Sequence, residues 1–186
     1  MTQPEHAPMH SFVLIGMPGS GKTELGRMAA EALGLSFADL DKEIERRAGR
    51  SPRAIITEDG EAAFRKIETE ALAACAGVSD IPRIDTAGAE RPGLVLSTGG
   101  GIVTAPENLA LLRRIGPIVW IRRELDAIAD AVSYSHDRPL LQDRASLDAL
   151  WEARGALYAA WADALFDNKG KAAHAAAGLT SLLRTL

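Results

Sequence analysis

Residues 16–23 read Gly-Met-Pro-Gly-Ser-Gly-Lys-Thr, which is a complete GxxxxGK[ST] phosphate-binding loop. The apolar run 12–15 precedes the motif and a helical pattern follows it, as the motif requires. Glycines let the backbone curl so that its N–H groups point at phosphate oxygens, and the start of the helix adds to the attraction. We expect Lys22 to reach the β- and γ-phosphates and the Thr23 hydroxyl to ligate Mg²⁺. The expected nucleotide contacts in this loop are Gly19, Ser20, Gly21, Lys22, Thr23 and Glu24.

Two aspartates follow one element after this loop. P-loop proteins often take a second magnesium contact from an Asp that ends a neighbouring apolar strand, but here the apolar run 94–96 ends in Ser97. Asp39 and Asp41 are therefore the candidates. On an extended segment both side chains would project from one face, Asp39 beside the metal and Asp41 beside an acceptor hydroxyl. The alternative is two solvated acids at a strand end or helix N-cap.

Two arginines indicate where an anionic acceptor would bind. Arg154 falls on the apolar stripe of a helical pattern over 147–165, and a guanidinium on a buried face needs an anion. Arg65 lies at the rim of the buried face predicted for the helix 61–75. Either arginine could instead snorkel or pair with a local glutamate. Together with the turn Gly99-Gly100-Gly101, where a ligand could approach the backbone closely, they outline a site for a small carboxylate-bearing molecule.

A segment without periodicity lies between two helical patterns and suits a mobile lid over about 132–144. It contains Arg138. An arginine on a closing loop can neutralise charge on a transferring phosphoryl group. The alternative is an exposed lid charge.

Three short apolar runs, 12–15, 94–96 and 118–121, alternate with helical patterns. This alternation predicts an α/β fold of the P-loop NTPase type, a parallel sheet flanked by helices on both faces. No linker divides the chain, so we expect one domain over 1–186 with flexible residues 1–10 and a surface loop over 78–93. The helical patterns cover 22–33, 42–48, a segment opened by Ser51-Pro52, 61–75, 106–114, 124–132, 147–165 and a short stretch after Gly178.

The composition is that of a soluble globular domain. Hydrophobic residues make up 47% of the 186 residues and charged residues 25%, which excludes a disordered chain. The net charge of −4 gives no general attraction to nucleic acid or to anionic lipid. No run approaches the roughly 18–20 apolar residues of a membrane span. The single cysteine, Cys75, fits a reducing compartment. We expect a cytoplasmic monomer with small-molecule substrates and neither nucleic acid nor a membrane as partner.

Several separated motifs in a fixed order make the chain similar to the shikimate kinases, from Phe12 to about Lys171. The resemblance implies ATP-dependent phosphorylation of the 3-hydroxyl of shikimate, with Mg²⁺ as cofactor, in aromatic amino-acid biosynthesis. The alternatives are a kinase for another small hydroxy acid such as gluconate, or a nucleotide-binding module without catalysis. The matching segments are GMPGSGKTELGR (16–27), FADLDKEIERRAGRS (37–51), DGEAAFRKIE (59–68), LSTGGG (96–101), RPLL (138–141) and RGALYAAWAD (154–163).

The resemblance also implies roles for individual residues. Asp39 would help hold Mg²⁺, and Asp41 would contact the substrate hydroxyls and act as base. Arg65 and Arg154 would bind the shikimate carboxylate beside the backbone of Gly100. Arg138 would reach the ATP phosphates from the lid. The chain departs from the family in having Ala156 where a proline is common, and in lacking a basic residue in the lid before Arg138.

Overall fold

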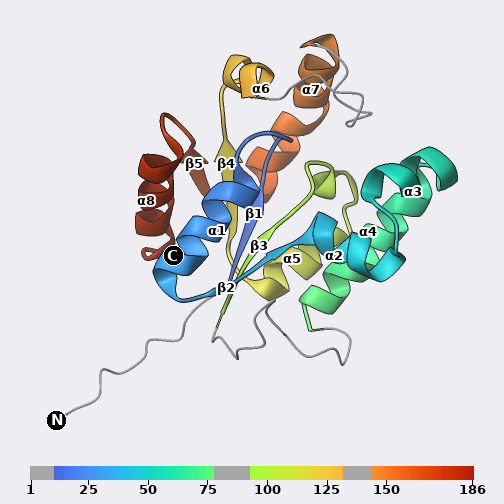
Figure 1. The fold of residues 1–186 in the computed structure, drawn as a ribbon, viewed down its shortest axis with the longest axis horizontal. Helices are drawn as coiled ribbons and strands as arrows, with labels where there is room; N and C mark the ends of the chain where they lie inside the picture. The colour runs from blue at the N-terminus through green and yellow to red at the C-terminus, as the bar shows by residue number, and fades with distance from the viewer. Residues whose placement is uncertain (1–10, 78–92, 132–143) are drawn as a thin grey trace.

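A computed structural model of the chain describes residues 11–77, 93–131 and 144–186. Five parallel strands form one sheet in the order β2-β3-β1-β4-β5 (Figure 1). The expected flexible lead-in, most of the expected surface loop and all but the last residue of the expected lid, Arg138 included, lie outside the described residues. The strands are β1 (Phe12–Ile15), β2 (Ser36–Asp39), β3 (Leu94–Ser97), β4 (Ile118–Arg122) and β5 (Ala164–Asp167).

Helices cover both faces of the sheet, as the sequence predicts (Figure 1). Side chains alternate between the faces along β1: Phe12 and Leu14 pack with α1 and α8, whereas Val13 and Ile15 pack into the larger cluster on the other face. All four side chains of β1 are buried, which explains its continuous apolar run. The helices are α1 (Lys22–Leu33), α2 (Leu40–Ala48), α3 (Pro52–Asp59), α4 (Glu61–Cys75), the 3₁₀ turn η1 (Ile102–Thr104), α5 (Asn108–Ile115), α6 (Leu125–Ala131), α7 (Arg144–Trp161) and α8 (Ala172–Leu183).

The local start and stop signals act as expected. Gly34 ends α1 in a left-handed conformation with φ 69°, and the Ser51 hydroxyl accepts a hydrogen bond from the Ala54 N–H at 3.2 Å to cap α3. Helix α4 has the predicted bounds. Cys75 at its end is half-buried.

The C-terminal quarter differs from the prediction, which ran one helix to residue 165 and missed β5. Helix α7 ends at Trp161 because Asp163 turns the chain into the sheet. Its N–H donates to the Ile118 carbonyl at 2.8 Å, and its carboxylate accepts from the Ile118 N–H at 2.8 Å. Leu165, predicted on the buried stripe, lies in β5 and is 42% exposed. Within the described ranges, no helix is long and apolar enough to cross a membrane.

Candidate functional site

The glycine-rich loop joins β1 to α1 and surrounds the ammonium group of Lys22. Lys22 is buried, and its Nζ donates to the carbonyls of Gly16 at 2.9 Å and Met17 at 2.8 Å. Gly16 has φ 142°, and a Cβ there would lie 2.4 Å from the Ile121 carbonyl oxygen, so the loop packs closely against β4. The loop therefore carries its positive charge inward at the start of α1, where phosphate oxygens bind in such loops.

Oxygen atoms from three elements meet beside this loop. The Thr23 hydroxyl donates to Asp39 Oδ2 at 2.7 Å, and its Oγ1 lies 3.2 Å from Ser97 Oγ. Asp39 and Ser97 are paired residues of β2 and β3. Hydroxyl and carboxylate oxygens are ligands that Mg²⁺ accepts, so the donor set fits a magnesium ion.

The expected arrangement of the two aspartates is wrong in its geometry. Strand β2 ends at Asp39, and α2 begins at Leu40 rather than at residue 42. The Asp39 carboxylate accepts from the N–H groups of Asp41 at 3.1 Å and Lys42 at 3.4 Å, so Asp39 is the N-cap of α2. Asp41 consequently lies in the first helical turn and not one pleat further along a strand.

Asp41 lies against the glycine turn after β3. A Cβ built on Gly99 would come within 3.0 Å of Asp41 Oδ1. Burial raises the pKa of the Asp41 carboxyl, the charge of Asp39 raises it further, and Lys22 and Arg65 oppose the rise. A carboxylate with a raised pKa is better matched to accept a proton near neutral pH.

Arg65 is held by two glutamates of its own helix. Its Nη1 donates to Glu68 Oε2 at 2.6 Å, and its Nη2 donates to Glu61 Oε1 at 2.8 Å. The Glu68 side chain is fully buried, and burial raises its pKa while the charge of Arg65 lowers it. Among the described residues, Glu68 Oε1 and Arg65 Nε have no hydrogen-bond partner. The alternative interpretation of Arg65, pairing with a local glutamate, is therefore realised, and both unpartnered atoms are buried.

Sequence reasoning missed Glu68, although a signal was present. Glu68 lies one helical turn after Phe64, on the face of α4 that was predicted to be buried. An acid at such a position needs a partner for the same reason that Arg154 does on α7.

Arg154 is buried at 6% exposure, as its position on the apolar stripe predicted. The hydroxyl of Tyr158, one turn further along α7, donates to the Gly100 carbonyl, and the nearby charge of Arg154 opposes the rise that burial causes in the pKa of Tyr158. Arg154 also lies near enough to Glu68 to lower its pKa. Helix α7 thus brings Arg154 to the same glycine turn that faces Arg65 and Asp41.

The three glycines of this turn leave room for the protein's own side chains. A Cβ on Gly100 would lie 2.6 Å from Pro18 Cδ, and a Cβ on Gly101 would lie 2.1 Å from Arg65 Nη2. Protein atoms lie where the Cβ atoms of these glycines would be, and the expected approach of a ligand to the same backbone stays a prediction. The glycine turn is what allows the phosphate-binding loop and the arginine of α4 to come together.

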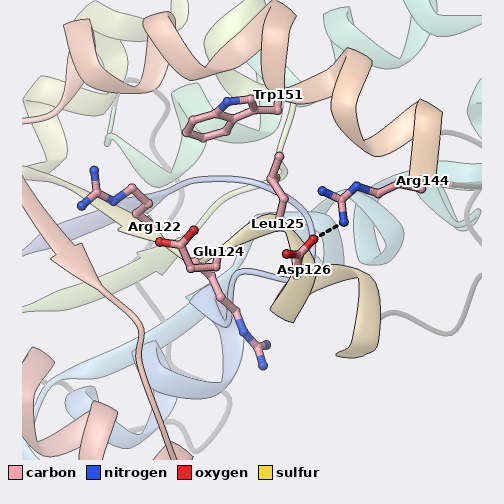
Figure 2. Close-up of a pocket in the computed structure, with 7 residues that line it drawn as sticks. Arg122, Glu124, Leu125, Asp126, Arg144 and Trp151 are labelled. Atoms are coloured by element: carbon pink, nitrogen blue, oxygen red, sulfur yellow. Dashed lines mark hydrogen bonds and ion pairs between the residues drawn. The ribbon is translucent and has the colours of Figure 1, made fainter.

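A cavity of about 450 Å³ opens where β4 passes into α6 (Figure 2). An ion pair between Arg144 of α7 and Asp126 of α6 lies along it. Arg123, from the same turn, donates to the Gly19 carbonyl of the phosphate-binding loop at 3.2 Å. The cavity is lined by Arg122, Arg123, Glu124, Leu125, Asp126, Arg144 and Trp151.

A second side-chain contact to the phosphate-binding loop comes from Asn168, the residue after β5, and was not predicted from the sequence. Asn168 Nδ2 donates to the Ser20 carbonyl at 2.8 Å, and the Asn168 N–H donates to the Arg122 carbonyl at 2.7 Å. Since the predicted helix ran to residue 165 and no strand was predicted after it, no sequence signal placed Asn168 beside this loop. Ser20 Oγ is buried and has no hydrogen-bond partner within the described part of the chain.

The structure therefore brings most of the predicted residues together at the carboxyl ends of β1, β2 and β3. The contacts described above make neighbours of the P-loop residues, Asp39, Asp41, Arg65, Arg154 and the glycine turn. Glu24 is exposed in the first turn of α1 and takes no part in those contacts. Arg138 lies outside the described residues.

Comparisons with known proteins show which family this chain resembles. The family model described as "Shikimate kinase" matches residues 18–184. The shikimate kinase of Bordetella avium (strain 197N) is 40% identical over 157 residues, covering 83% of this chain and 69% of that protein. A solved shikimate kinase from Acinetobacter baumannii in complex with shikimate has a TM-score of 0.81 and 30% identity, covering 96% of this chain and 95% of that one.

A gluconokinase from Sinorhizobium meliloti 1021 is more distant, with a TM-score of 0.51 and 18% identity over 97% of both chains. At that identity the likeness shows a shared fold and gives no information on the substrate.

Proposed function

The chain belongs to the shikimate kinase family, and from that premise we propose that it transfers the γ-phosphoryl group of ATP to the 3-hydroxyl of shikimate, giving shikimate 3-phosphate and ADP for aromatic amino-acid biosynthesis. The observation that carries the proposal is the meeting of Arg65, Arg154 and Asp41 at one glycine turn beside the phosphate-binding loop. The acceptor requires cationic groups to bind its carboxylate, which Arg65 and Arg154 supply, and a carboxylate to accept the proton of its hydroxyl, which Asp41 supplies.

The nucleotide half of the site is proposed to be the P-loop. The backbone of Gly19, Ser20 and Gly21 holds the phosphates, and the Lys22 ammonium neutralises charge on the β- and γ-phosphates. Glu24 follows in the first turn of α1 and completes the set of residues at the nucleotide. Arg138 is proposed to reach the phosphates as the transfer proceeds.

Thr23 and Asp39 are proposed to hold Mg²⁺, a role supported by their 2.7 Å contact beside the P-loop. When bound, the ion would supply positive charge that offsets the charge developing on the phosphates. The Thr23–Asp39 bond keeps the hydroxyl and the carboxylate at one position, and the Asp41 N–H keeps the Asp39 carboxylate oriented through the cap of α2.

The acceptor half is proposed to lie between α4, α7 and the glycine turn. Arg65 and Arg154 bind the carboxylate of shikimate, and the backbone of Gly99, Gly100 and Gly101 lines the ring. Asp41 accepts the proton of the 3-hydroxyl as the new O–P bond forms and the bond from phosphorus to the leaving oxygen of ADP breaks. Because little covalent chemistry is needed from the protein, positioning and charge neutralisation supply most of the rate enhancement.

We further propose that residues 1–186 act as one catalytic domain with a lid over about 132–144. The same proposal makes the chain a cytoplasmic monomer whose partners are its small-molecule substrates. A net charge of −4 supports the absence of nucleic acid among them.

The test is ADP release from MgATP in a coupled assay, with shikimate, gluconate or no acceptor. We expect a signal with shikimate alone, and near-complete loss of it in Lys22→Ala. A signal with gluconate alone would assign the arginine pair to a different hydroxy acid. Bound ATP with no acceptor-dependent signal would indicate a nucleotide-binding module without catalysis.

A further inference from the structure

Tyr158 carries a hydroxyl group in an otherwise apolar part of α7. The residue is fully buried, and its ring stacks on Trp120 of β4 with centroids 6.0 Å apart and an interplanar angle of 28°. Aromatic packing of this kind needs only the ring. A buried hydroxyl costs free energy unless it is hydrogen-bonded, so its partners indicate its purpose.

The hydroxyl joins α7 to the glycine turn close to Arg154. It donates to the carbonyl of Gly100. Arg154 precedes Tyr158 by one helical turn, so the two side chains are neighbours on one face of α7, and the charge of Arg154 lowers the pKa of the hydroxyl. The ring on Trp120 fixes where that hydroxyl lies.

We propose that Tyr158 is a positioning residue, whose hydrogen bond to the Gly100 carbonyl fixes the glycine turn against α7 and so holds the carboxylate-binding Arg154 at a fixed distance from that turn. The inference rests on the proposed function, because it assigns Arg154 and Gly100 to the acceptor. Without the hydroxyl, the Gly100 carbonyl loses its donor, and the glycine turn is no longer fixed relative to Arg154.

The coupling is expected to act on acceptor binding and not on the nucleotide. Arg154 and Gly100 lie on the acceptor side, whereas Lys22 is held by the carbonyls of Gly16 and Met17. Burial raises the pKa of Tyr158 to about 12, so the hydroxyl keeps its proton at ordinary assay pH. Its contribution should therefore be independent of pH between about 6 and 9.

The test is Tyr158→Phe, which keeps the ring and removes the hydroxyl. We expect the KM for shikimate to rise about tenfold, with the KM for ATP and kcat within about twofold of wild type. The same ratio is expected across the pH range above. Tyr158→Met, a second apolar replacement without the hydroxyl, is measured beside it and should show the same split if the phenylalanine variant folds poorly.

Thr180→Val is the matched control. The Thr180 hydroxyl is likewise buried and donates to a backbone carbonyl, that of Ala176 in α8, at 2.8 Å. It lies on the opposite face of the sheet from Tyr158. Both variants should lower Tm, but only loss of the Tyr158 hydroxyl should raise the KM for shikimate.

A double-mutant cycle with Arg154→Lys separates coupling from a general loss of packing. If Tyr158 acts through Arg154, the combined variant loses less shikimate affinity than the product of the two single effects. An unchanged KM for shikimate in a folded Tyr158→Phe, or strictly multiplicative effects in the cycle, would overturn the positioning role while wild-type turnover stands. Absence of shikimate-dependent turnover in the wild type would overturn the proposed function itself.

Discussion

Replacing Gly101 by alanine places one methyl group against the arginine that is proposed to bind the acceptor. Gly101 has φ −96° and ψ 0°, so alanine is compatible with its backbone. The added Cβ would lie 2.1 Å from Arg65 Nη2 and 2.5 Å from Nη1. Because the guanidinium is the end of a flexible side chain, it and not the turn should move.

The expected loss of stability follows from the ion pair with Glu68 that the Arg65 guanidinium must give up. Its Nη1 is 2.6 Å from Oε2 of Glu68, a fully buried side chain. Breaking a buried pair costs about 3–5 kcal/mol when the remaining charge is uncompensated. Glu68 has a raised pKa and can take up a proton, so we expect the free energy of unfolding to fall by about 1–3 kcal/mol. Loss of Arg65 from the carboxylate should weaken shikimate binding by roughly 10- to 100-fold.

The assay measures the KM for each substrate with the other saturating, together with Tm. Gly101→Ala should raise the KM for shikimate and leave the KM for ATP within about twofold of wild type. Gly178→Ala is the control, because it adds a methyl group in α8 where the nearest atoms belong to the Phe166 ring at 3.2 Å. A folded Gly101→Ala protein with the wild-type KM for shikimate would refute the placement of Arg65 at the carboxylate.

Three further predictions concern Asp39, Asp41 and Cys75. Asp39→Asn keeps an N-cap for α2 but removes the carboxylate beside Thr23, so the Mg²⁺ concentration for half-maximal rate should rise at least about tenfold with little change in Tm. An unchanged Mg²⁺ requirement would speak against Asp39 as a ligand. Because the pKa of Asp41 is raised, its carboxylate takes up a proton at a pH above 3.8, and kcat should fall on acidification through that range. The same carboxyl should make the free energy of unfolding decrease as pH rises from 3.8 to the pKa of Asp41 in the folded protein. Asp41→Asn should remove both effects, and a pH profile that the substitution leaves unaltered would exclude Asp41 as the base. Cys75, whose pKa burial raises to about 11, should react with iodoacetamide at about pH 8 roughly 100-fold more slowly than an ordinary thiol, and labelling at the ordinary rate, followed by mass spectrometry, would contradict that environment.

Local signals explain what could be predicted from the sequence. The P-loop, its strand and its helix are contiguous, so motif and periodicity point to one structure over residues 12–33. The burial of Arg154 was also predictable, because it depends on a helical stripe that the residues themselves display.

The rest depended on contacts between distant segments. Strand β5 forms because Asp163 hydrogen-bonds to Ile118 at the start of β4, and no feature of residues 161–167 predicts that pairing. The relation of Asp39 to Asp41 depended on where a strand stops and a helix starts, which is the least certain boundary to predict. Glu68, in contrast, could have been identified from local signals, because it is an acid on a predicted buried face three residues after Arg65 on the same helix.

The measurement that tests the central claim most directly is the position of the new phosphate in the product of the wild-type enzyme. After incubation with MgATP and shikimate, phosphorus–proton correlation NMR should couple the new phosphorus to the proton on carbon 3 of the acceptor ring. A phosphate on another hydroxyl would contradict the placement of Asp41 at the 3-hydroxyl. Formation of no phosphorylated acceptor would contradict the kinase assignment as a whole.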